Sequence, residues 1–156
     1  MTTYAGIDPG LSGAIAFFNP DKGLLIVHDM PTVEVTRNGK KKNEINAYAL
    51  ANLFPAVATD EAVLERVGAM PGQGVTSVFS FGRSVGIVEG VLAALSISVT
   101  IVSPQAWQKA AGVRGGKDGS RLRASELFPN YAALFSRKKD DGRADAALMA
   151  WYAATK

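Results

Sequence analysis

The sequence of 156 residues contains no cysteine and only one histidine, His28. The lack of cysteine excludes disulfide bonds, thiolate zinc sites and cysteine nucleophiles. A single histidine argues against a histidine-based mechanism, and we expect His28 to be structural. No apolar run approaches the roughly 18 residues of a membrane span, and the first segment, MTTYAGIDPG, lacks the basic and apolar regions of a signal peptide. These absences predict a cytoplasmic protein without a membrane partner.

Hydrophobic residues make up 47% of the chain and charged residues 20%, which is enough apolar surface for a folded core. The length fits one domain, residues 1–156, and there is no internal repeat. The net charge is only +3, but residues 101–139 hold eight basic and two acidic residues. Such a segment either binds phosphates or is a solvated basic face. Its basic residues are Lys109, Arg114, Lys117, Arg121, Arg123, Arg137, Lys138 and Lys139.

Apolar runs and turn residues predict alternating strands and helices. Short β-prone runs separated by DPGLSG and NPDKG predict a three-stranded antiparallel meander. Right-handed crossovers would place two later strands parallel to the first. The sequence therefore predicts an α/β fold, a mixed five-stranded sheet with helices on both faces. The expected strands are residues 4–8, 14–18, 24–28, 62–67 and 98–102, and the expected helices begin near Asn46, Ser77, Pro104, Ser120 and Asp141.

Two carboxylates are expected at the carboxyl ends of neighbouring strands. Asp8 ends the first strand in IDPG, and Glu65 lies in AVLERVG, an otherwise apolar run. An acid in an apolar strand is costly unless it is paired or binds a cation. Asp8 could instead initiate the turn before Pro-Gly, and Glu65 could pair with a base. In sheets of this type, ligands bind at the carboxyl ends of the parallel strands.

The segment KKDDGRADAALMAWYA adds further acids. Asp141 and Asp145 are four residues apart and therefore share one face of a helix. Asp140 or Asp141 could be the N-cap of that helix, but Asp145 lies one turn inside it, beside an alanine-rich apolar seam. Three separate segments thus bring at least four carboxylates to one edge of the sheet. Hard oxygen ligands of this kind suit Mg²⁺ or Mn²⁺, commonly as a pair of ions acting on a phosphodiester.

Three motifs occur in the order GIDPGLSGAIAFF, LERVGAMPGQGVTSVFSFGRS and DDGRADAALMA. Together they resemble the motifs of the RuvC-type Holliday junction resolvases of the RNase H-like superfamily, particularly their small phage-borne relatives, and the resemblance covers nearly the whole chain. It implies an RNase H-like fold and an Mg²⁺-dependent endonuclease that works as a homodimer and nicks four-way DNA junctions symmetrically. Two ions per site, with Mn²⁺ as a substitute, and the cytoplasm of a bacterium or a phage-infected host cell are further implications.

The resemblance also implies roles for individual acids. Asp8 matches the family's first-strand aspartate, Glu65 its second-strand glutamate and Asp145 the acid of its last helix. Bacterial members place the remaining ligand three residues before that last acid, where this chain has Gly142. Asp141 is therefore assigned as the fourth ligand. Asp140 is the reserve. In-line attack on the phosphate would leave 5′-phosphate and 3′-hydroxyl ends.

Other residues are expected to contact the DNA or the developing charge. Lys117 resembles the family's active-site lysine in position, and Lys109 is a weaker match. Met70 or Phe79 could wedge against bases, and Arg83 could hold a phosphate, although Phe79 and Phe81 could also pack in the core. The candidate DNA contacts are Met70, Gln73, Phe79, Arg83, Lys109, Arg114, Lys138 and Lys139.

Gly82, Gly86 and Gly90 form a stripe of small residues on the predicted middle helix. Such a stripe lets another backbone approach closely, either the sheet beneath it or a partner helix in a homodimer. Two other functional classes also remain open. One is a non-catalytic or RNA-directed nucleic-acid-binding protein of the same fold. The other is a phosphotransferase of the actin and sugar-kinase group, which needs two such lobes.

Overall fold

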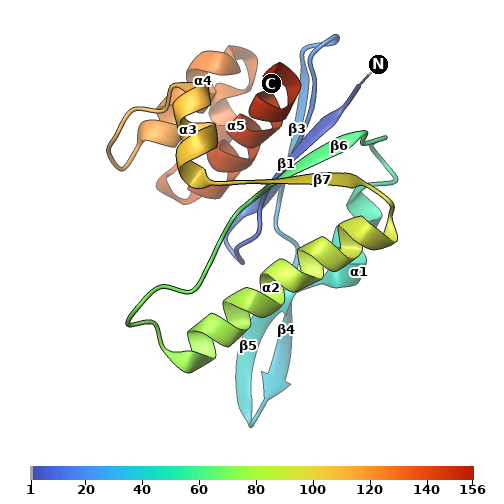
Figure 1. Cartoon of the computed structure of the whole chain (residues 1–156), viewed down its shortest axis with the longest axis vertical. Helices are drawn as coiled ribbons and strands as arrows, with labels where there is room; N and C mark the ends of the chain where they lie inside the picture. The colour runs from blue at the N-terminus through green and yellow to red at the C-terminus, as the bar shows by residue number, and fades with distance from the viewer. Residues whose placement is uncertain (1) are drawn as a thin grey trace.

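The fold is built on a five-stranded mixed sheet in the order β3-β2-β1-β6-β7 (Figure 1). This computed structural model describes residues 2–156. The first three strands form an antiparallel meander, β6 pairs in parallel with β1, and β7 pairs in parallel with β6. The predicted α/β architecture is confirmed. The strands are β1 (Tyr4–Asp8), β2 (Ala14–Asn19), β3 (Leu24–Asp29), β6 (Glu61–Glu65) and β7 (Ser98–Val102).

Helices cover both faces of this sheet (Figure 1). The last helix, α5, packs across β1 and β2 with α3 and α4 beside it, and α1 and α2 lie on the opposite face. Because side chains alternate along a strand, the sheet contributes to two separate buried clusters. The helices are α1 (Ala47–Leu53), α2 (Val75–Ala94), α3 (Pro104–Ala111), α4 (Gly119–Leu127) and α5 (Asp141–Thr155), with short 3₁₀ helices η1 (Pro129–Phe135) and η2 (Lys138–Asp140) between α4 and α5.

Side-chain caps fix where α1 and α3 begin. The Asn46 side chain accepts a hydrogen bond from the backbone N–H of Ala49, at 3.1 Å. Ser103 does the same for Ala106, at 3.2 Å, and Pro104 follows in the first turn, where its missing N–H costs nothing. Both predicted helix starts are confirmed.

α5 approaches β1 so closely that only glycine fits at position 6. A Cβ atom on Gly6 would lie 2.1 Å from the carbonyl oxygen of Ala146 and 2.4 Å from the amide nitrogen of Ala150. The buried face of α5 consists largely of alanine, so the helix axis lies near the sheet. The first turns of α5 therefore lie against the end of β1. The buried alanines of α5 are Ala144, Ala146, Ala147, Ala150 and Ala153.

A two-stranded hairpin projects beside α2, formed by β4 (Thr32–Arg37) and β5 (Lys40–Ile45) (Figure 1). The strands expected from the sequence do not include these two, because residues 37–42 are polar and basic, so the hairpin is a correction. Arg37 pairs with Lys40, which leaves Asn38 and Gly39 as a two-residue turn with φ values of 53° and 74°. Asn-Gly between alternating residues is a strong hairpin signal, and the dense positive charge around it obscured that signal.

α2 is a long, apolar helix of which only a narrow stripe is buried. Its buried residues are Ser84, Val88 and Leu92. By length and composition alone it could cross a membrane, which corrects the expectation that no segment approaches that length. One such helix is weak evidence for a membrane span, and this one carries Arg83 and Glu89.

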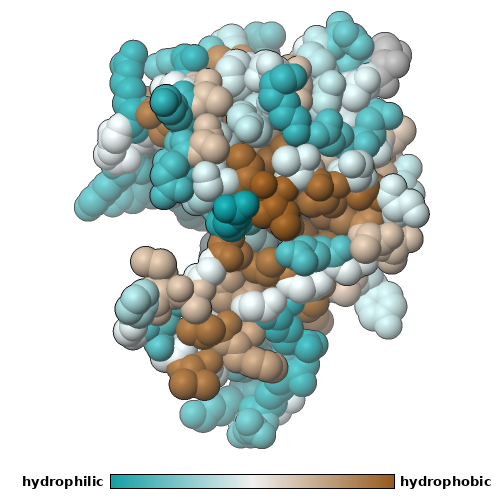
Figure 2. All heavy atoms as spheres, viewed as in Figure 1, coloured by the Kyte–Doolittle hydropathy of each residue, from teal (hydrophilic) through white to brown (hydrophobic). Residues whose placement is uncertain are grey.

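The glycine stripe and the aromatic residues of α2 lie on its exposed side. Nothing lies within 4 Å of Cβ atoms built on Gly82, Gly86 and Gly90, so the stripe does not pack on this chain's own sheet. Phe79 is 72% exposed and Phe81 40% exposed, so the core interpretation is wrong for both. Figure 2 shows hydrophobic residues gathered on the face that α2 and β7 share.

Replacing Gly6 by alanine should lower the free energy of unfolding by about 1–3 kcal/mol, because the methyl group would push α5 away from β1. Urea unfolding followed by circular dichroism measures this change. Gly68 has nothing within 4 Å of its Cβ position, so Gly68→Ala is the matched control and should stay within about 0.5 kcal/mol of wild type. Equal stability of Gly6→Ala and wild type would contradict the close contact.

Candidate active site

Asp8 and Glu65 are neighbours at the carboxyl ends of β1 and β6. Ile7 pairs with Leu64 in the parallel register, so the residues that follow them also lie side by side. Ile7 and Leu64 belong to the buried cluster under α1 and α2, and alternation therefore places Asp8 and Glu65 on the face that α5 covers.

Hydrogen bonds orient both carboxylates. Oδ1 of Asp8 accepts from the backbone N–H of Gly10 at 3.2 Å, and Oε2 of Glu65 accepts from the indole Nε1 of Trp107 at 2.8 Å. Burial raises the pKa of Asp8 and of Glu65 above their usual values. The bond from Trp107 lowers the pKa of Glu65, but the negative charge of Asp8 raises it again, so these two carboxylates repel each other.

Asp145, on the second turn of α5, joins this group. Burial first, and then the charges of Asp8, Glu65 and Asp141, raise the pKa of Asp145 to about 7, although a hydrogen bond with Ser120 lowers it. Asp145 is therefore close enough to the other three predicted acids to respond to their charges.

Asp141 lies at the start of α5, where Arg121 of α4 holds it. Arg121 Nε donates to Asp141 Oδ1 at 3.1 Å, and the same guanidinium pairs with Asp118 and reaches two backbone carbonyl groups. The Asp141 side chain is 57% exposed and lines the same cavity as Asp145. The guanidinium of Arg121 is therefore the cation with which Asp141 pairs in this structure.

The two neighbours of Asp141 cannot take its place. Asp140 is 1% exposed, and its carboxylate accepts hydrogen bonds from the backbone and guanidinium of Arg137, with Arg143 at 3.7 Å. A Cβ atom on Gly142 would lie 2.5 Å from the carbonyl oxygen of Ser12. Position 142 therefore has no room for a side chain, and the carboxylate of Asp140 is occupied by Arg137 at the start of η2.

An open cavity of about 340 Å³ lies over Asp141 and Asp145. Lys117 and Arg114 line it from the glycine-rich loop between α3 and α4, and both are exposed. Lys109 is exposed on α3 but does not line this cavity. Of the two lysines considered, Lys117 is thus the one that the fold brings to the acids.

The donor set fits a divalent cation. Within residues 2–156, no three His, Asp or Glu side chains are arranged to enclose a metal ion as they stand. The carboxylates of Asp8, Glu65 and Asp145 are nevertheless partly buried with raised pKa values, a state that an added positive charge would relieve. Asp141 already pairs with a cation, the guanidinium of Arg121.

The loop between β6 and α2 exposes most of the residues predicted to contact DNA. Met70 is 67% exposed, and its backbone N–H donates to Oε1 of Gln73 at 2.7 Å. Arg83 pairs with Glu44 of the hairpin at 3.4 Å, so its guanidinium already has an anionic partner in this structure. Arg114, Lys138 and Lys139 are exposed, and their roles stay predictions.

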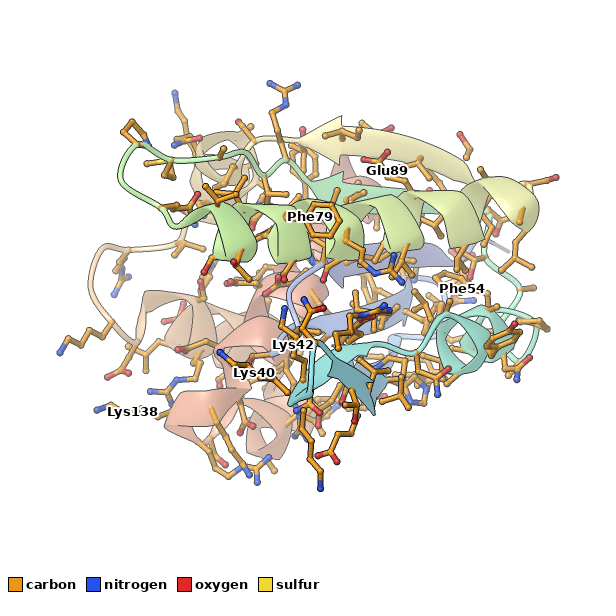
Figure 3. The ribbon with its side chains drawn as sticks, turned by 90° about the horizontal axis from the view of Figure 1, so that it is seen from below. Lys40, Lys42, Phe54, Phe79, Glu89 and Lys138 are labelled. Atoms are coloured by element: carbon orange, nitrogen blue, oxygen red, sulfur yellow. The ribbon has the colours of Figure 1, made fainter. Side chains whose placement is uncertain are left out.

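The hairpin is a further basic surface, and the predicted DNA contacts include none of its residues. Arg37, Lys40, Lys41 and Lys42 cluster at its tip, and a cavity of about 180 Å³ between hairpin and α2 is lined by Lys42, Phe79 and both arginines of the Glu44 pairs. Figure 3 shows Lys40 and Lys42 on the hairpin below Phe79 of α2. The run KKK after Asn-Gly is the sequence pattern that indicates this basic surface. No sequence pattern indicates the contacts of Arg121 and Trp107, because they join segments far apart in the chain.

A mixed sheet of this strand order, with helices on both faces, is an RNase H-like arrangement, and acids lie at the ends of β1 and β6 and on the helix that crosses them. The structure aligns with the RuvC protein of Thermus thermophilus in complex with a Holliday junction substrate, with a TM-score of 0.59 and 14% identity, over 98% of this chain and 96% of that one. A second T. thermophilus RuvC structure aligns over the same shares with a TM-score of 0.56.

The chain is also similar in sequence to the chloroplastic Holliday junction resolvase MOC1 of Chlamydomonas reinhardtii. The two are 34% identical over 86 residues, which is 54% of this chain and 10% of that protein. No protein-family model matches the chain. The resemblance to RuvC-type resolvases thus extends from three motifs to the whole fold.

Without metal, Asp145 should make the protein less stable as pH rises. Its folded pKa of about 7 lies above the usual 3.8, so the folded state holds a proton that the unfolded state releases between these values. The free energy of unfolding should therefore fall from pH 4 to pH 7, by as much as about 4 kcal/mol, and then level off.

The variant Asp145→Asn should lose this component of the pH dependence. Urea unfolding in EDTA from pH 4.5 to 8 measures it, and the advantage of Asp145→Asn over wild type should grow up to pH 7. Asp21→Asn, in the exposed β2–β3 turn, is the control. Parallel curves for Asp145→Asn and wild type would show that Asp145 is not the titrating group.

Proposed function

We propose that this chain is a divalent-metal-dependent endonuclease that nicks four-way DNA junctions. The observation that carries the proposal is the meeting of four carboxylates from three distant segments, with raised pKa values for three of them, at the carboxyl edge of a RuvC-type sheet. The sequence similarity to MOC1 and the fold similarity to junction-bound RuvC support the same substrate class.

Asp8, Glu65, Asp141 and Asp145 would hold Mg²⁺ or Mn²⁺, as two ions. A divalent cation bound there supplies the charge that polarises a phosphodiester and activates water for in-line attack. The carboxylates of this chain would fix the position of that charge, because α5 is held against β1 at Gly6 and β6 pairs with β1. Asp141 would have to leave Arg121 to join them.

Lys117 would carry a further positive charge to the phosphate. It lies on an exposed glycine-rich loop that faces Asp141 and Asp145 across the cavity. The loop is tied at both ends: Arg123 Nε donates to the carbonyl of Ala111 at 2.6 Å, and Arg121 pairs with Asp118. Lys117 is therefore free to move only within a short span, which suits a group that stabilises a developing oxyanion.

The DNA arms would lie over three exposed basic groups around the acids. They are the loop with Arg114 and Lys117, the pair Lys138 and Lys139 on η2, and the hairpin tip, of which Figure 3 shows members. Met70 and Phe79 are exposed enough to meet bases.

A homodimer through α2 would supply the two active sites that symmetric nicking needs. A junction has approximate two-fold symmetry, and an isologous dimer has the same operator. Gly82, Gly86 and Gly90 face open space on an apolar, largely exposed helix. Three glycines on one stripe of a helix cost up to about 1 kcal/mol each against alanine, and close contact with a second copy of the helix would offset that cost.

Asp8→Asn or Glu65→Gln should reduce nicking of a labelled synthetic junction by about 100-fold or more. Junction affinity should stay equal or improve, because fewer carboxylates would repel the phosphates. Asp141→Asn should harm nicking more than Asp140→Asn, and Asp21→Asn should leave it unchanged. Substantial cleavage by Asp8→Asn or Glu65→Gln would rule out this assignment of the metal ligands, while binding without cleavage in wild type would favour a non-catalytic module.

Junction affinity should fall steeply with salt, with a log–log slope of roughly −0.9 per phosphate contact. Lys138→Ala combined with Lys139→Ala should reduce the size of that slope by about 1.8 if both lysines contact phosphates. Lys22→Ala, in the turn at the opposite edge of the sheet, is the control. An unchanged slope in the double variant would place the DNA elsewhere.

Gly86→Leu should give a folded monomer that makes unpaired nicks, since the new side chain would hold two α2 helices apart. Sedimentation gives the mass, and product symmetry on a cruciform plasmid gives the pairing of cuts. Thr76→Leu, in the exposed first turn of α2, is the control and should remain dimeric. A Gly86→Leu dimer with paired cuts would overturn this interface.

A further inference from the structure

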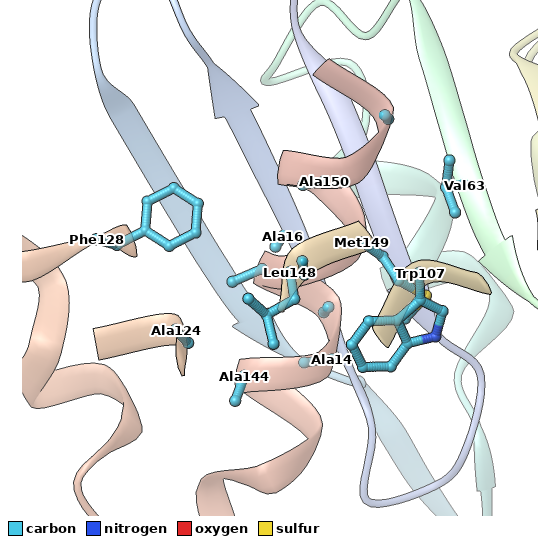
Figure 4. Close-up of a cluster of buried hydrophobic side chains, with 14 of the residues drawn as sticks. Ala14, Ala16, Val63, Trp107, Ala124, Phe128, Ala144, Leu148, Met149 and Ala150 are labelled. Atoms are coloured by element: carbon cyan, nitrogen blue, oxygen red, sulfur yellow. The ribbon is translucent and has the colours of Figure 1, made fainter. Parts of the chain in front are cut away.

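Trp107 is a buried aromatic residue with one polar atom, and that atom touches the candidate site. The side chain is 0% exposed and packs among Val63, Leu148 and Met149 (Figure 4). Its Nε1–H donates to Oε2 of Glu65 at 2.8 Å, across 42 residues of sequence.

The fold brings these two residues together by register. Glu65, the last residue of β6, pairs with Val102, the last residue of β7. Ser103 then caps α3, and Trp107 follows one turn later, so its ring lies over the end of β6. The contact therefore follows from the strand ends themselves.

Packing alone does not explain tryptophan at this position. A phenylalanine would fill much of the same apolar space without bringing a donor that must find an acceptor. Glutamate has three side-chain torsions, and a charge-assisted hydrogen bond at one oxygen removes most of that freedom. Within residues 2–156, Oε1 of Glu65 accepts no hydrogen bond, so the second oxygen is left for another partner.

We propose that Trp107 is a positioning residue: its indole N–H holds Oε2 of Glu65 so that Oε1 is presented to a divalent cation shared with Asp8. The inference rests on the proposed function for the step that the cation assists. The hydrogen bond between Trp107 and Glu65 does not depend on that function. Partners that orient a ligating group typically change metal affinity or activity by 10–100-fold when they are removed.

The variant Trp107→Phe removes the N–H and keeps an aromatic ring in the core. Its dissociation constant for Mn²⁺, measured by calorimetry on the DNA-free protein, should rise about 10-fold. The Mg²⁺ concentration for half-maximal nicking should rise by a similar factor, with the rate at saturating Mg²⁺ largely recovered. Trp151→Phe is the matched control: Trp151 borders the same cluster, and its indole makes no hydrogen bond within the described chain.

The two measurements separate this inference from the proposed function. If Trp107→Phe binds Mn²⁺ as wild type does, the positioning role is overturned even if wild type nicks junctions. If Mn²⁺ affinity falls but wild type nicks no junction, the positioning role stands and the proposed function fails. Wild-type protein that binds no Mn²⁺ overturns both.

A loss of folding in Trp107→Phe would call for a closer analogue. Benzothienylalanine at position 107, in a Trp151→Phe background, replaces the N–H by sulfur and keeps the fused ring. The same 10-fold loss of Mn²⁺ affinity is expected, and wild-type affinity in this variant would overturn the role of the N–H.

Discussion

The contact between β1 and α5 at Gly6 is the constraint on which the rest of the candidate site depends. It brings two backbones together with no side chain between them, which only glycine on the strand and alanines on the helix allow. Asp8 lies two residues further along β1 and Asp145 just before Ala146, so the contact sets the separation of their carboxylates. Any residue larger than glycine at position 6 would widen that separation before it affected the acids directly.

The short separation of the acids also lowers the stability of the folded protein. Burial and mutual repulsion disfavour the charged forms of these carboxylates, which raises the pKa values of Asp8, Glu65 and Asp145. Neighbouring groups offset part of this cost: Trp107 bonds Glu65, and Arg121 pairs with Asp141. Such an arrangement of acids lowers the stability of the folded protein, and groups with shifted pKa values of this kind are typical of functional sites.

The sequence predicts the sheet and the acids because these depend on local patterns. Each strand has its own apolar run and turn, and Asp8, Glu65 and Asp145 stand out because an acid is unusual in an apolar context. The pairing of Arg121 with Asp141 could not be predicted in this way, because it depends on how α4 docks on α5, and the same is true of Trp107 and Glu65. The exposure of Phe79 also depends on tertiary structure: the N-terminal half of α2 extends beyond the sheet that would have buried it.

Gly142 couples the two sides of the acid group mechanically. Its α-carbon lies against the backbone of Ser12 and Gly13, in the turn that follows Asp8, while its own helix carries Asp141 and Asp145. The turn and the helix start therefore form one stiff joint, because neither can shift without the other. A strand of nucleic acid pressed against the turn would therefore move the carboxylates together as one group. The distances among the carboxylates would stay the same.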